Sequence, residues 1–379
     1  MSAVIKWLKE QNHRRVFYMR KLRKSLYSKV FILLNHPKKS HTPDFSKPLN
    51  IGIMMLNKGI GDTIVASGLI SELKNRSHNV SIICNEKLHR SIKDIYADLC
   101  GFIVIRKKQS LLSLLMNRIH VDLIIDLYDD DVKDYAYERS LNKFKNPYVV
   151  GFNSHMCAGC YNQLFERNIC EHFSKRSEFV LKELFNISVP EYSYHMNVSP
   201  AADSSVNEFL KPLPAGKLVV VNSQASCPYR SLSEQMINNI ISYFSGAYCR
   251  DDAEKRLCSV VLLNFKKEDI TVPAENVHIP ALKSFEEVVS LIKKADFLIS
   301  PDTSIVHVGC AFHKKAVYMY NNRIDHDQEV NTVWGPVGSD SIVVTTSEYL
   351  HSNKGDDLRK LDFKPVKDAL EKSGFTKDE

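Results

Sequence analysis

From Leu49 onward the chain alternates short apolar segments with helical segments, and this alternation constrains its fold more than any other feature. The first half has expected strands at residues 51–56, 80–84, 102–105 and 122–126, with helices at 63–75, 88–97 and 111–117. The second half has expected strands at residues 218–222, 259–263, 297–299 and 316–320, with helices at 233–243, 284–294 and 303–312. Repeated strand–helix–strand units form parallel, doubly wound sheets. The sequence therefore predicts an α/β protein with two Rossmann-like halves facing a cleft.

A predicted helix at residues 175–185 and a proline-bearing stretch after it mark the passage between the halves. We expect four segments: an arm and linker at 1–48, a Rossmann-like domain at 49–198, a second one at 199–346, and a closing helical segment at 347–379. Each of the two central segments is long enough to bury a core of its own.

The net charge of +7 is unevenly distributed along the chain. Residues 1–47 hold 12 basic and 2 acidic side chains, a net charge of +10, whereas the other 332 residues hold 39 basic and 42 acidic side chains, a net charge of −3. Apolar residues of the arm recur at the three- and four-residue spacings of an amphipathic helix: Tyr18, Leu22, Leu26, Val30 and Leu33. The basic arm either packs on the body or lies on anionic lipid. Nucleic acid is not an expected partner, because the body has no basic stripe.

Cysteine usage favours a cytoplasmic protein. Nine cysteines in 379 residues are too sparse for a disulfide scaffold, and no secretory leader or membrane-spanning run stands out. Cys157, Cys160 and Cys170 lie near His155 and His172 in the sequence. A single Cys-x-x-Cys pair is a weak zinc pattern, so we expect no metal.

The first polar loop after a predicted strand contains Lys58, Gly59, Gly61 and Asp62. Its glycines permit a tight turn and close approach of a ligand, and the N-terminus of the following helix favours anions. The loop lacks the third glycine of a dinucleotide fingerprint and the Lys-Ser/Thr ending of a Walker motif. Asp62 either caps its helix or acts as a general base, and an acidic group in an anion-attracting loop favours the base.

Two loops of the second half are suited to phosphate. One loop leads from a strand into a helix, and the free N–H groups and the dipole of that helix suit a diphosphate. This loop contains Asp302, Thr303 and Ser304, and His307 follows one helical turn later. The other loop offers hydroxyl groups and a guanidinium, from Ser223, Ser226 and Arg230. The alternatives are that His307 is a structural histidine and that the loop with Ser223, Ser226 and Arg230 is an ordinary polar loop.

The Gly59-Ile60-Gly61-Asp62 loop, together with Asp302-Thr303-Ser304 and His307, resembles the paired signatures of glycosyltransferase family 9, the bacterial heptosyltransferases. The resemblance extends from about residue 49 to residue 344 in the same element order. It implies a GT-B fold and an inverting, metal-independent transferase that adds heptose from ADP-heptose to the inner core of lipopolysaccharide or lipooligosaccharide. The nucleotide sugar is then a co-substrate of the second domain, and no cofactor is expected.

The resemblance also implies roles for individual residues. Asp62 matches the catalytic carboxylate that takes a proton from the acceptor hydroxyl. The residues that it implies for donor binding are Ser223, Ser226, Arg230, Asp302, Thr303, Ser304 and His307. Those that it implies for the acceptor side are Lys58, Gly59, Gly61, His172 and Arg176. The acceptor is then a lipid-linked core oligosaccharide at the inner face of the bacterial inner membrane, where residues 1–47 have an anionic surface to bind.

Several positions depart from the family pattern. Ser304 replaces the usual glycine, Arg230 a lysine, Leu232-Ser233 a Trp-Pro pair and Asn321-Asn322 a Gly-Pro pair, while Trp334-Gly335-Pro336 is expected to replace part of the missing loop. These changes leave two alternatives open. One is the transfer of another sugar, a hexose or N-acetylhexosamine, to the same class of acceptor. The other is a non-catalytic protein that binds a nucleotide sugar or anionic lipid.

Overall fold

The computed structural model describes most of the chain beyond the arm. It covers residues 41–106, 119–129, 141, 143–168, 170–248, 258–263, 277–325, 328–347, 350–351 and 356–375, and the arm positions Arg15, Tyr18, Met19, Leu22 and Leu26. The expected helix at 111–117 and the arm positions Val30 and Leu33 lie outside these residues. Across the described ranges, we find no helix with the length and apolarity needed to span a bilayer.

The first half is built on six parallel strands in the order β3-β2-β1-β4-β5-β6. The strands are β1 (Asn50–Met54), β2 (Asn79–Asn85), β3 (Gly101–Ile105), β4 (Leu123–Ile125), β5 (Tyr148–Phe152) and β6 (Gln163–Phe165). Its helices are α2 (Ile60–Asn75), α3 (Glu86–Ile92) and α6 (Ser174–Phe185). The predicted strands and helices of this half are confirmed where they are described, except that the helix expected at 88–97 ends at Ile92. Strands β5 and β6 were not predicted.

The second half repeats this plan in the order β14-β11-β10-β7-β8-β9, again with all neighbours parallel. Its strands are β7 (Lys217–Asn222), β8 (Cys258–Leu263), β9 (Val277–His278), β10 (Phe297–Pro301), β11 (Lys315–Tyr320) and β14 (Ser341–Thr345). Its helices are α7 (Pro200–Leu210), α8 (Glu234–Tyr248), α9 (Phe285–Lys294), α10 (Ser304–Ala311) and α12 (Phe363–Lys372). Numbered by their rank within each half, both sheets read 3-2-1-4-5-6, the order of dinucleotide-binding folds.

A small third sheet, β13-β12-β15, stands beside the second half. It consists of β12 (Arg323–Asp325), β13 (Gln328–Glu329) and β15 (Leu350–His351), and the short helix α11 (Val330–Val333) follows β13. The predicted closing helix is α12, which begins later than residue 347. Both large sheets fall within the expected segments 49–198 and 199–346, but the domain limits themselves stay predictions.

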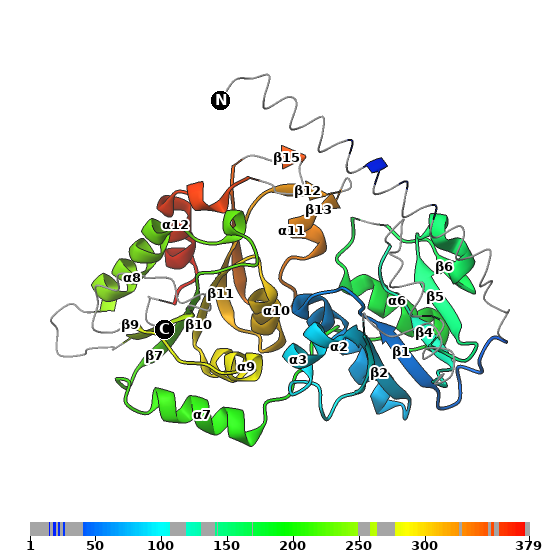
Figure 1. Ribbon diagram of the computed structural model, residues 1–379. Helices are drawn as coiled ribbons and strands as arrows, with labels where there is room; N and C mark the ends of the chain where they lie inside the picture. Colours follow the sequence, from blue (N-terminus) through cyan, green and yellow to red (C-terminus); the bar gives the residue numbers. More distant parts are fainter. Residues whose placement is uncertain are drawn as a thin grey trace.

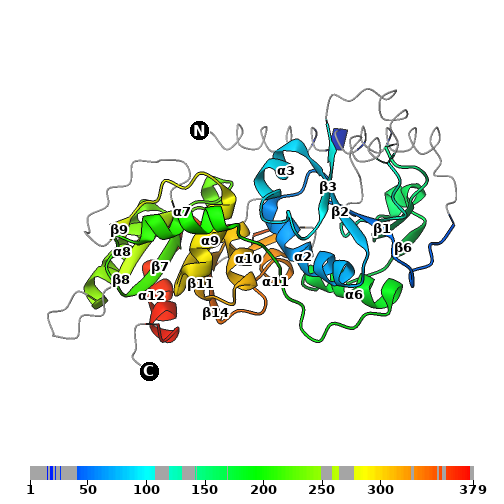
Figure 2. The same ribbon diagram turned by 90° about the horizontal axis from the view of Figure 1, so that it is seen from below.

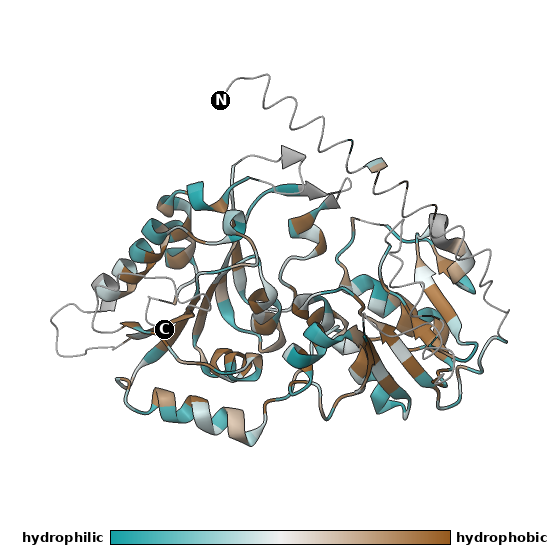
Figure 3. Cartoon of the chain, in the orientation of Figure 1, coloured by the Kyte–Doolittle hydropathy of each residue, from teal (hydrophilic) through white to brown (hydrophobic). Residues whose placement is uncertain are grey.

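The apolar side chains of the second sheet alternate between two faces, as the period of a strand requires. Val219, Val221 and Ile299 face a cluster with α8 and α12, whereas Val220 and Leu298 face the opposite way. That opposite cluster also contains side chains of the first sheet and of α2, so one apolar core extends through both halves. Figures 1 and 2 show the halves side by side with α2 packed against α10, and Figure 3 shows that the strands are mainly hydrophobic.

Candidate active site

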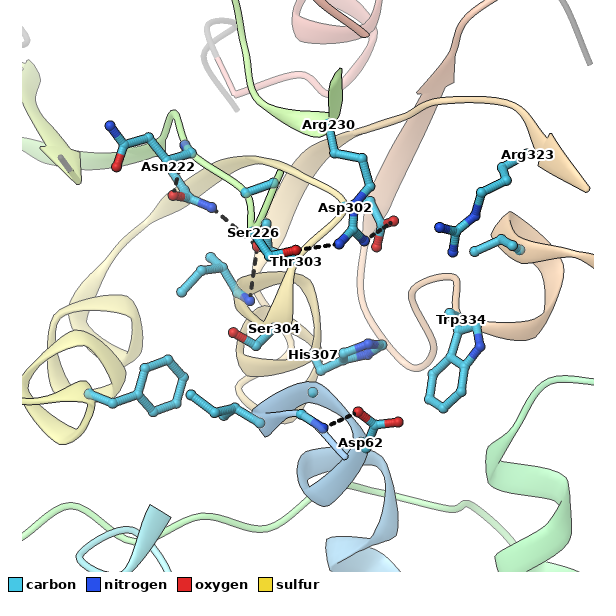
Figure 4. Close-up of a pocket in the computed structure, with 18 residues that line it drawn as sticks. Asp62, Asn222, Ser226, Arg230, Asp302, Thr303, Ser304, His307, Arg323 and Trp334 are labelled. Carbon is cyan, nitrogen blue, oxygen red and sulfur yellow. Dashed lines mark hydrogen bonds and ion pairs between the residues drawn. The ribbon is translucent and has the colours of Figure 1, made fainter. Parts of the chain in front are cut away.

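The site lies where the strand order of each sheet reverses. In such sheets, ligands bind beyond the carboxyl ends of the strands at this switch point. The switch strands are β1 and β4 in the first sheet and β7 and β10 in the second. A pocket of about 530 Å³ is lined by the loops after β1, β7 and β10, together with residues around α11. Figure 4 shows this pocket, to which both halves contribute.

Two helix N-termini, those of α2 and α10, meet at the pocket. A Cβ atom placed on Gly61 would lie 3.0 Å from Cδ2 of His307 and 3.6 Å from Cα of Ser304. Only glycine therefore allows α2 to approach α10 this closely without displacing the imidazole. The Thr303 hydroxyl caps α10 by accepting a hydrogen bond from the N–H of Ile305. The positive ends of both helix dipoles thus border one pocket.

Asp62 sits at the first of these N-termini, half-buried. Its Oδ2 accepts a 2.7 Å hydrogen bond from the N–H of Gly59, and its Oδ1 accepts a 2.8 Å hydrogen bond from the hydroxyl of Tyr128. The carboxylate therefore caps α2 and also lines the pocket, so the two interpretations are not exclusive. Lys58 lies beside it, with Nζ 3.7 Å from the centre of the Tyr128 ring.

Arg230 supplies a guanidinium from the loop after β7. Its Nη1 donates to Asp302 Oδ2 at 2.9 Å, its Nη2 to Ser226 Oγ at 2.6 Å, and its Nε to Cys227 Sγ at 3.2 Å. Burial opposes the charged form, but the adjacent Asp302 carboxylate raises the pKa of Arg230 above its usual value. Arg230 and Asp302 thus form a fixed ion pair at the wall of the pocket.

His307 is buried to 5% exposure, and its Nδ1 has no hydrogen-bond partner. Burial, assisted by the nearby His172, lowers the pKa of His307 to about 4. Burial also lowers the pKa of His172 to about 4. His172 accepts from Ser174 N–H at Nδ1 and pairs with the carbonyl of Gly335 through Nε2 at 3.2 Å, which is the pattern of a neutral imidazole. Both rings are therefore neutral at pH 7.

The segment around His172 connects the two halves. The rings of Phe173 and Trp334 stack at 4.4 Å, and the N–H of Phe173 donates to the carbonyl of Val333 at 2.9 Å. Trp334 in turn lines the pocket. Trp334, which belongs to the segment expected to replace part of the missing loop, thus lies at the site and is held there by Phe173 of the first half.

The structure brings most of the predicted site residues together. Those that line the pocket are Gly59, Gly61, Asp62, Ser226, Arg230, Asp302, Thr303, Ser304 and His307. Ser223 is buried and donates to the carbonyl of Leu263 at 3.1 Å. Arg176 is also buried and binds the carbonyl of Leu127 and the carboxylate of Asp129. Neither of these two side chains lines this pocket, and the acceptor-side role of Arg176 stays a prediction.

Sequence reasoning missed two functional candidates, Tyr128 and Arg323. Tyr128 follows β4, and Arg323 begins β12 a few residues after β11. A position a few residues after an inner parallel strand was a usable signal for both. Neither belongs to a glycine-rich or hydroxyl-rich loop, so motif spacing did not reveal them.

The cysteines show no metal centre within the side chains that the structure describes. No cluster of three or more His, Cys, Asp or Glu residues suited to a metal occurs among them. Cys160 is buried and Cys170 is exposed. The side chains of His155 and Cys157 lie outside the described set.

Known proteins resemble this chain in sequence and in fold. No family model matches the chain. A protein of Escherichia coli (strain K12), provisionally named lipopolysaccharide heptosyltransferase 4, is 22% identical over 303 residues, which cover 77% of this chain and 80% of that protein.

Three solved structures share the fold. The glycosyl transferase family 9 protein of Veillonella parvula DSM 2008 has a TM-score of 0.68 at 16% identity, covering 88% of this chain and 98% of that one. E. coli ADP-heptose lps heptosyltransferase II has a TM-score of 0.63 at 13% identity, covering 86% and 98%. E. coli heptosyltransferase WaaC with ADP has a TM-score of 0.59 at 15% identity, covering 85% and 99%. The fold is GT-B-like, and the chain is similar in sequence to a curated heptosyltransferase and in fold to solved structures of glycosyltransferase family 9 and of lipopolysaccharide heptosyltransferases.

Proposed function

We propose that this chain transfers heptose from ADP-heptose to the inner core of lipopolysaccharide or lipooligosaccharide, with inversion at the anomeric carbon. One observation carries the proposal: the Asp62 carboxylate of one half and the α10 N-terminus of the other line the same pocket. The E. coli relatives support the donor, since WaaC has been solved with ADP and with ADP-2-deoxy-2-fluoro heptose.

Asp62 is the proposed general base. The acceptor hydroxyl oxygen attacks the anomeric carbon, its proton passes to a carboxylate oxygen of Asp62, and the bond to the diphosphate breaks on the opposite face. Tyr128 and the Gly59 N–H hold one oxygen each of the carboxylate. These bonds fix the carboxylate in place while leaving each oxygen a second lone pair for the incoming proton.

The leaving nucleoside diphosphate gains negative charge as the bond breaks. The N–H groups and dipole at the start of α10 supply preorganised positive potential where that charge develops. Arg230 adds a guanidinium that Asp302 keeps in place. Charge stabilisation by these groups needs no metal ion, and we propose a metal-independent transfer.

We propose that the arm binds an anionic membrane surface, which places the enzyme beside a lipid-linked acceptor at the inner face of the inner membrane. Three helical arm positions on one face are exposed: Tyr18 at 69%, Leu22 at 57% and Leu26 at 58%. Residues 1–47 carry a net charge of +10. An apolar face flanked by many basic residues suits an anionic lipid interface.

The test of the function is a transfer assay on purified full-length chain. The acceptor is core oligosaccharide lipid from a heptose-deficient strain, and the donors are ADP-heptose, UDP-glucose and UDP-N-acetylglucosamine, each supplied separately with and without EDTA. We expect the mass of one heptose to be added only from ADP-heptose, with equal rates in EDTA. Transfer only from a UDP-sugar would show that the transferred sugar is a hexose or N-acetylhexosamine and not heptose. Donor binding without turnover would show that the chain is a binding protein.

A further inference from the structure

Arg323, the first residue of β12, lines the pocket, and no hydrogen bond or ion pair joins it to the other lining side chains that the structure describes. Its Nε atom is buried and has no hydrogen-bond partner among the described residues. Figure 4 shows its guanidinium pointing into the space between Asp302 and Trp334. A buried guanidinium nitrogen without an acceptor carries an unrecovered desolvation cost, which an anionic ligand would remove.

The charges around the pocket explain why a second cation is needed. Arg230 and Asp302 compensate each other as an ion pair. His307 is neutral at pH 7, because burial lowers its pKa to about 4. Among the titratable side chains that line the pocket, Asp62 and Arg323 are the charges that remain, and their sum is zero. Lys58 lies beside Asp62 but does not line the pocket. Without Arg323 the lining would carry a net charge of −1, which disfavours a diphosphate, whereas with Arg323 the helix N-termini add a positive potential to a neutral lining.

We propose that Arg323 binds a phosphoryl oxygen of the nucleoside diphosphate and thereby determines donor affinity. This inference rests on the proposed function, since it concerns the donor of the same reaction. Arg323 then acts from the side of the pocket opposite Ser226 (Figure 4). An arginine fork donates to phosphoryl oxygens with better geometry than a lysine, and its charge is permanent.

The two residues before Arg323 give the site no charge. The nearby Asn321 and Asn322 are buried, and their amide groups bind the carbonyls of Asp356 and Thr346. Both of these side chains therefore hold the chain in place, and of residues 321–323 it is Arg323 whose side chain lines the pocket.

The experiment measures binding of ADP, UDP, GDP and adenosine by calorimetry to the full-length parental chain and to Arg323→Gln and Arg323→Lys variants. The matched control is Arg106→Gln, which alters an exposed arginine paired with Glu86 outside the pocket. We expect Arg323→Gln to weaken the preferred nucleoside diphosphate about tenfold, the scale of a charge-assisted hydrogen bond. Adenosine should bind equally to all variants, Arg323→Lys should recover part of the loss, and the control should match the parental chain.

The outcomes separate this inference from the function on which it rests. If the parental chain binds a nucleoside diphosphate and Arg323→Gln binds it equally well, the role of Arg323 is wrong while the proposed function stands. An equal loss of diphosphate and adenosine affinity also overturns it, because the substitution would then have disturbed the whole pocket. If the parental chain binds none of the three diphosphates, the proposed function fails, and the inference fails with it.

Discussion

The hydroxyl of Tyr128 donates a 2.8 Å hydrogen bond to Oδ1 of Asp62, which connects the loop after β4 to the loop after β1. The ring of Tyr128 packs against Phe173 at 4.8 Å, and Phe173 stacks on Trp334 of the other half. A continuous series of aromatic contacts therefore extends from the carboxylate to Trp334 on the wall of the pocket. In the proposed reaction Tyr128 is a positioning residue, because it would act on substrate through Asp62.

Tyr128→Phe should lower kcat about tenfold and leave the KM for the nucleotide sugar unchanged. The substitution keeps the packing on Phe173 but frees Oδ1 of Asp62 to rotate away from the acceptor, and small displacements of a reacting group cost rate steeply. Tyr161→Phe is the matched control, since its hydroxyl binds Asp126 at 2.8 Å outside the pocket. Steady-state kinetics decide the matter: an equal loss in both variants would indicate a general packing effect.

Asp62→Asn should lower kcat about a thousandfold, within the range attributed to general bases. The amide oxygen still accepts from the Gly59 N–H, so α2 keeps its cap and the melting temperature should stay close to that of the parental chain. Affinity for ADP should not fall, because the carboxylate faces the acceptor in the proposed reaction. Asp94→Asn, at an exposed site, is the control. Parental turnover by Asp62→Asn would remove this residue from the mechanism.

Arg230→Ala should destabilise the fold by about 2–3 kcal/mol, because it leaves the largely buried Asp302 carboxylate without its partner. The double variant Arg230→Ala/Asp302→Asn should regain part of that stability, since no unpaired charge remains. Donor affinity should stay low in both variants, because the guanidinium is absent. Urea unfolding and ADP titration measure the two effects separately. A single variant as stable as the parental chain would show that the ion pair contributes nothing to the fold.

Stability should fall as the pH drops from about 6.5 towards 4. Burial lowers the pKa of both His172 and His307 to about 4, whereas an unfolded imidazole titrates near 6.5. In this window the unfolded chain binds protons that the folded chain does not, so each histidine removes up to about 1.4 kcal/mol of stability per pH unit.

The measurement is the free energy of urea unfolding at pH 7, 6 and 5. His172→Gln should show a flatter pH dependence than the parental chain, because one of the two linked groups is gone. An unchanged slope in His172→Gln would contradict the assignment.

Removal of residues 1–47 should release the chain from vesicles of anionic phospholipid and leave ADP affinity unchanged. The segment carries +10, and a basic residue near an anionic surface contributes about 1 kcal/mol. Co-sedimentation with vesicles, at low and high salt, measures the effect. A full-length variant with Leu22→Ser and Leu26→Ser tests the apolar face separately. Equal sedimentation of the truncated and full-length chains would count against the arm.

The regular parts of the fold could be predicted because their signals are local. β1 and β10 are buried apolar runs followed by polar loops, and α9 has both an apolar stripe and the Ser284 cap. The missed strands β6 and β9 have three and two residues, too few for a periodic pattern. Helix α7 was missed because its prolines suggested a linker, although Ser199 caps it and Pro200 occupies the first turn, where proline is tolerated.

The sequence predicted those residues of the site that belong to short loop motifs. Asp62 and the residues of the α10 N-terminus belong to short sequence patterns that imply their chemistry. Tyr128 and Arg323 do not, because their place in the pocket depends on which strands are neighbours and how two halves dock. Arg176 shows the opposite case: four-residue spacing from His172 suggested a pair, but the structure uses its guanidinium to bind Leu127 and Asp129.

The apolar core that extends through both halves limits how the two halves can move. A wide hinge motion would pull α2 away from α10 and expose side chains of both sheets to water, at about 25 cal/mol for each Å² of apolar surface. Small sliding of packed helices avoids that cost. At Gly61 the missing side chain leaves α2 and α10 in close contact. In the proposed reaction, substrates therefore enter a site that folding has already assembled. The conformational entropy of bringing Asp62 and the α10 N-terminus together is then lost once per molecule rather than once per turnover.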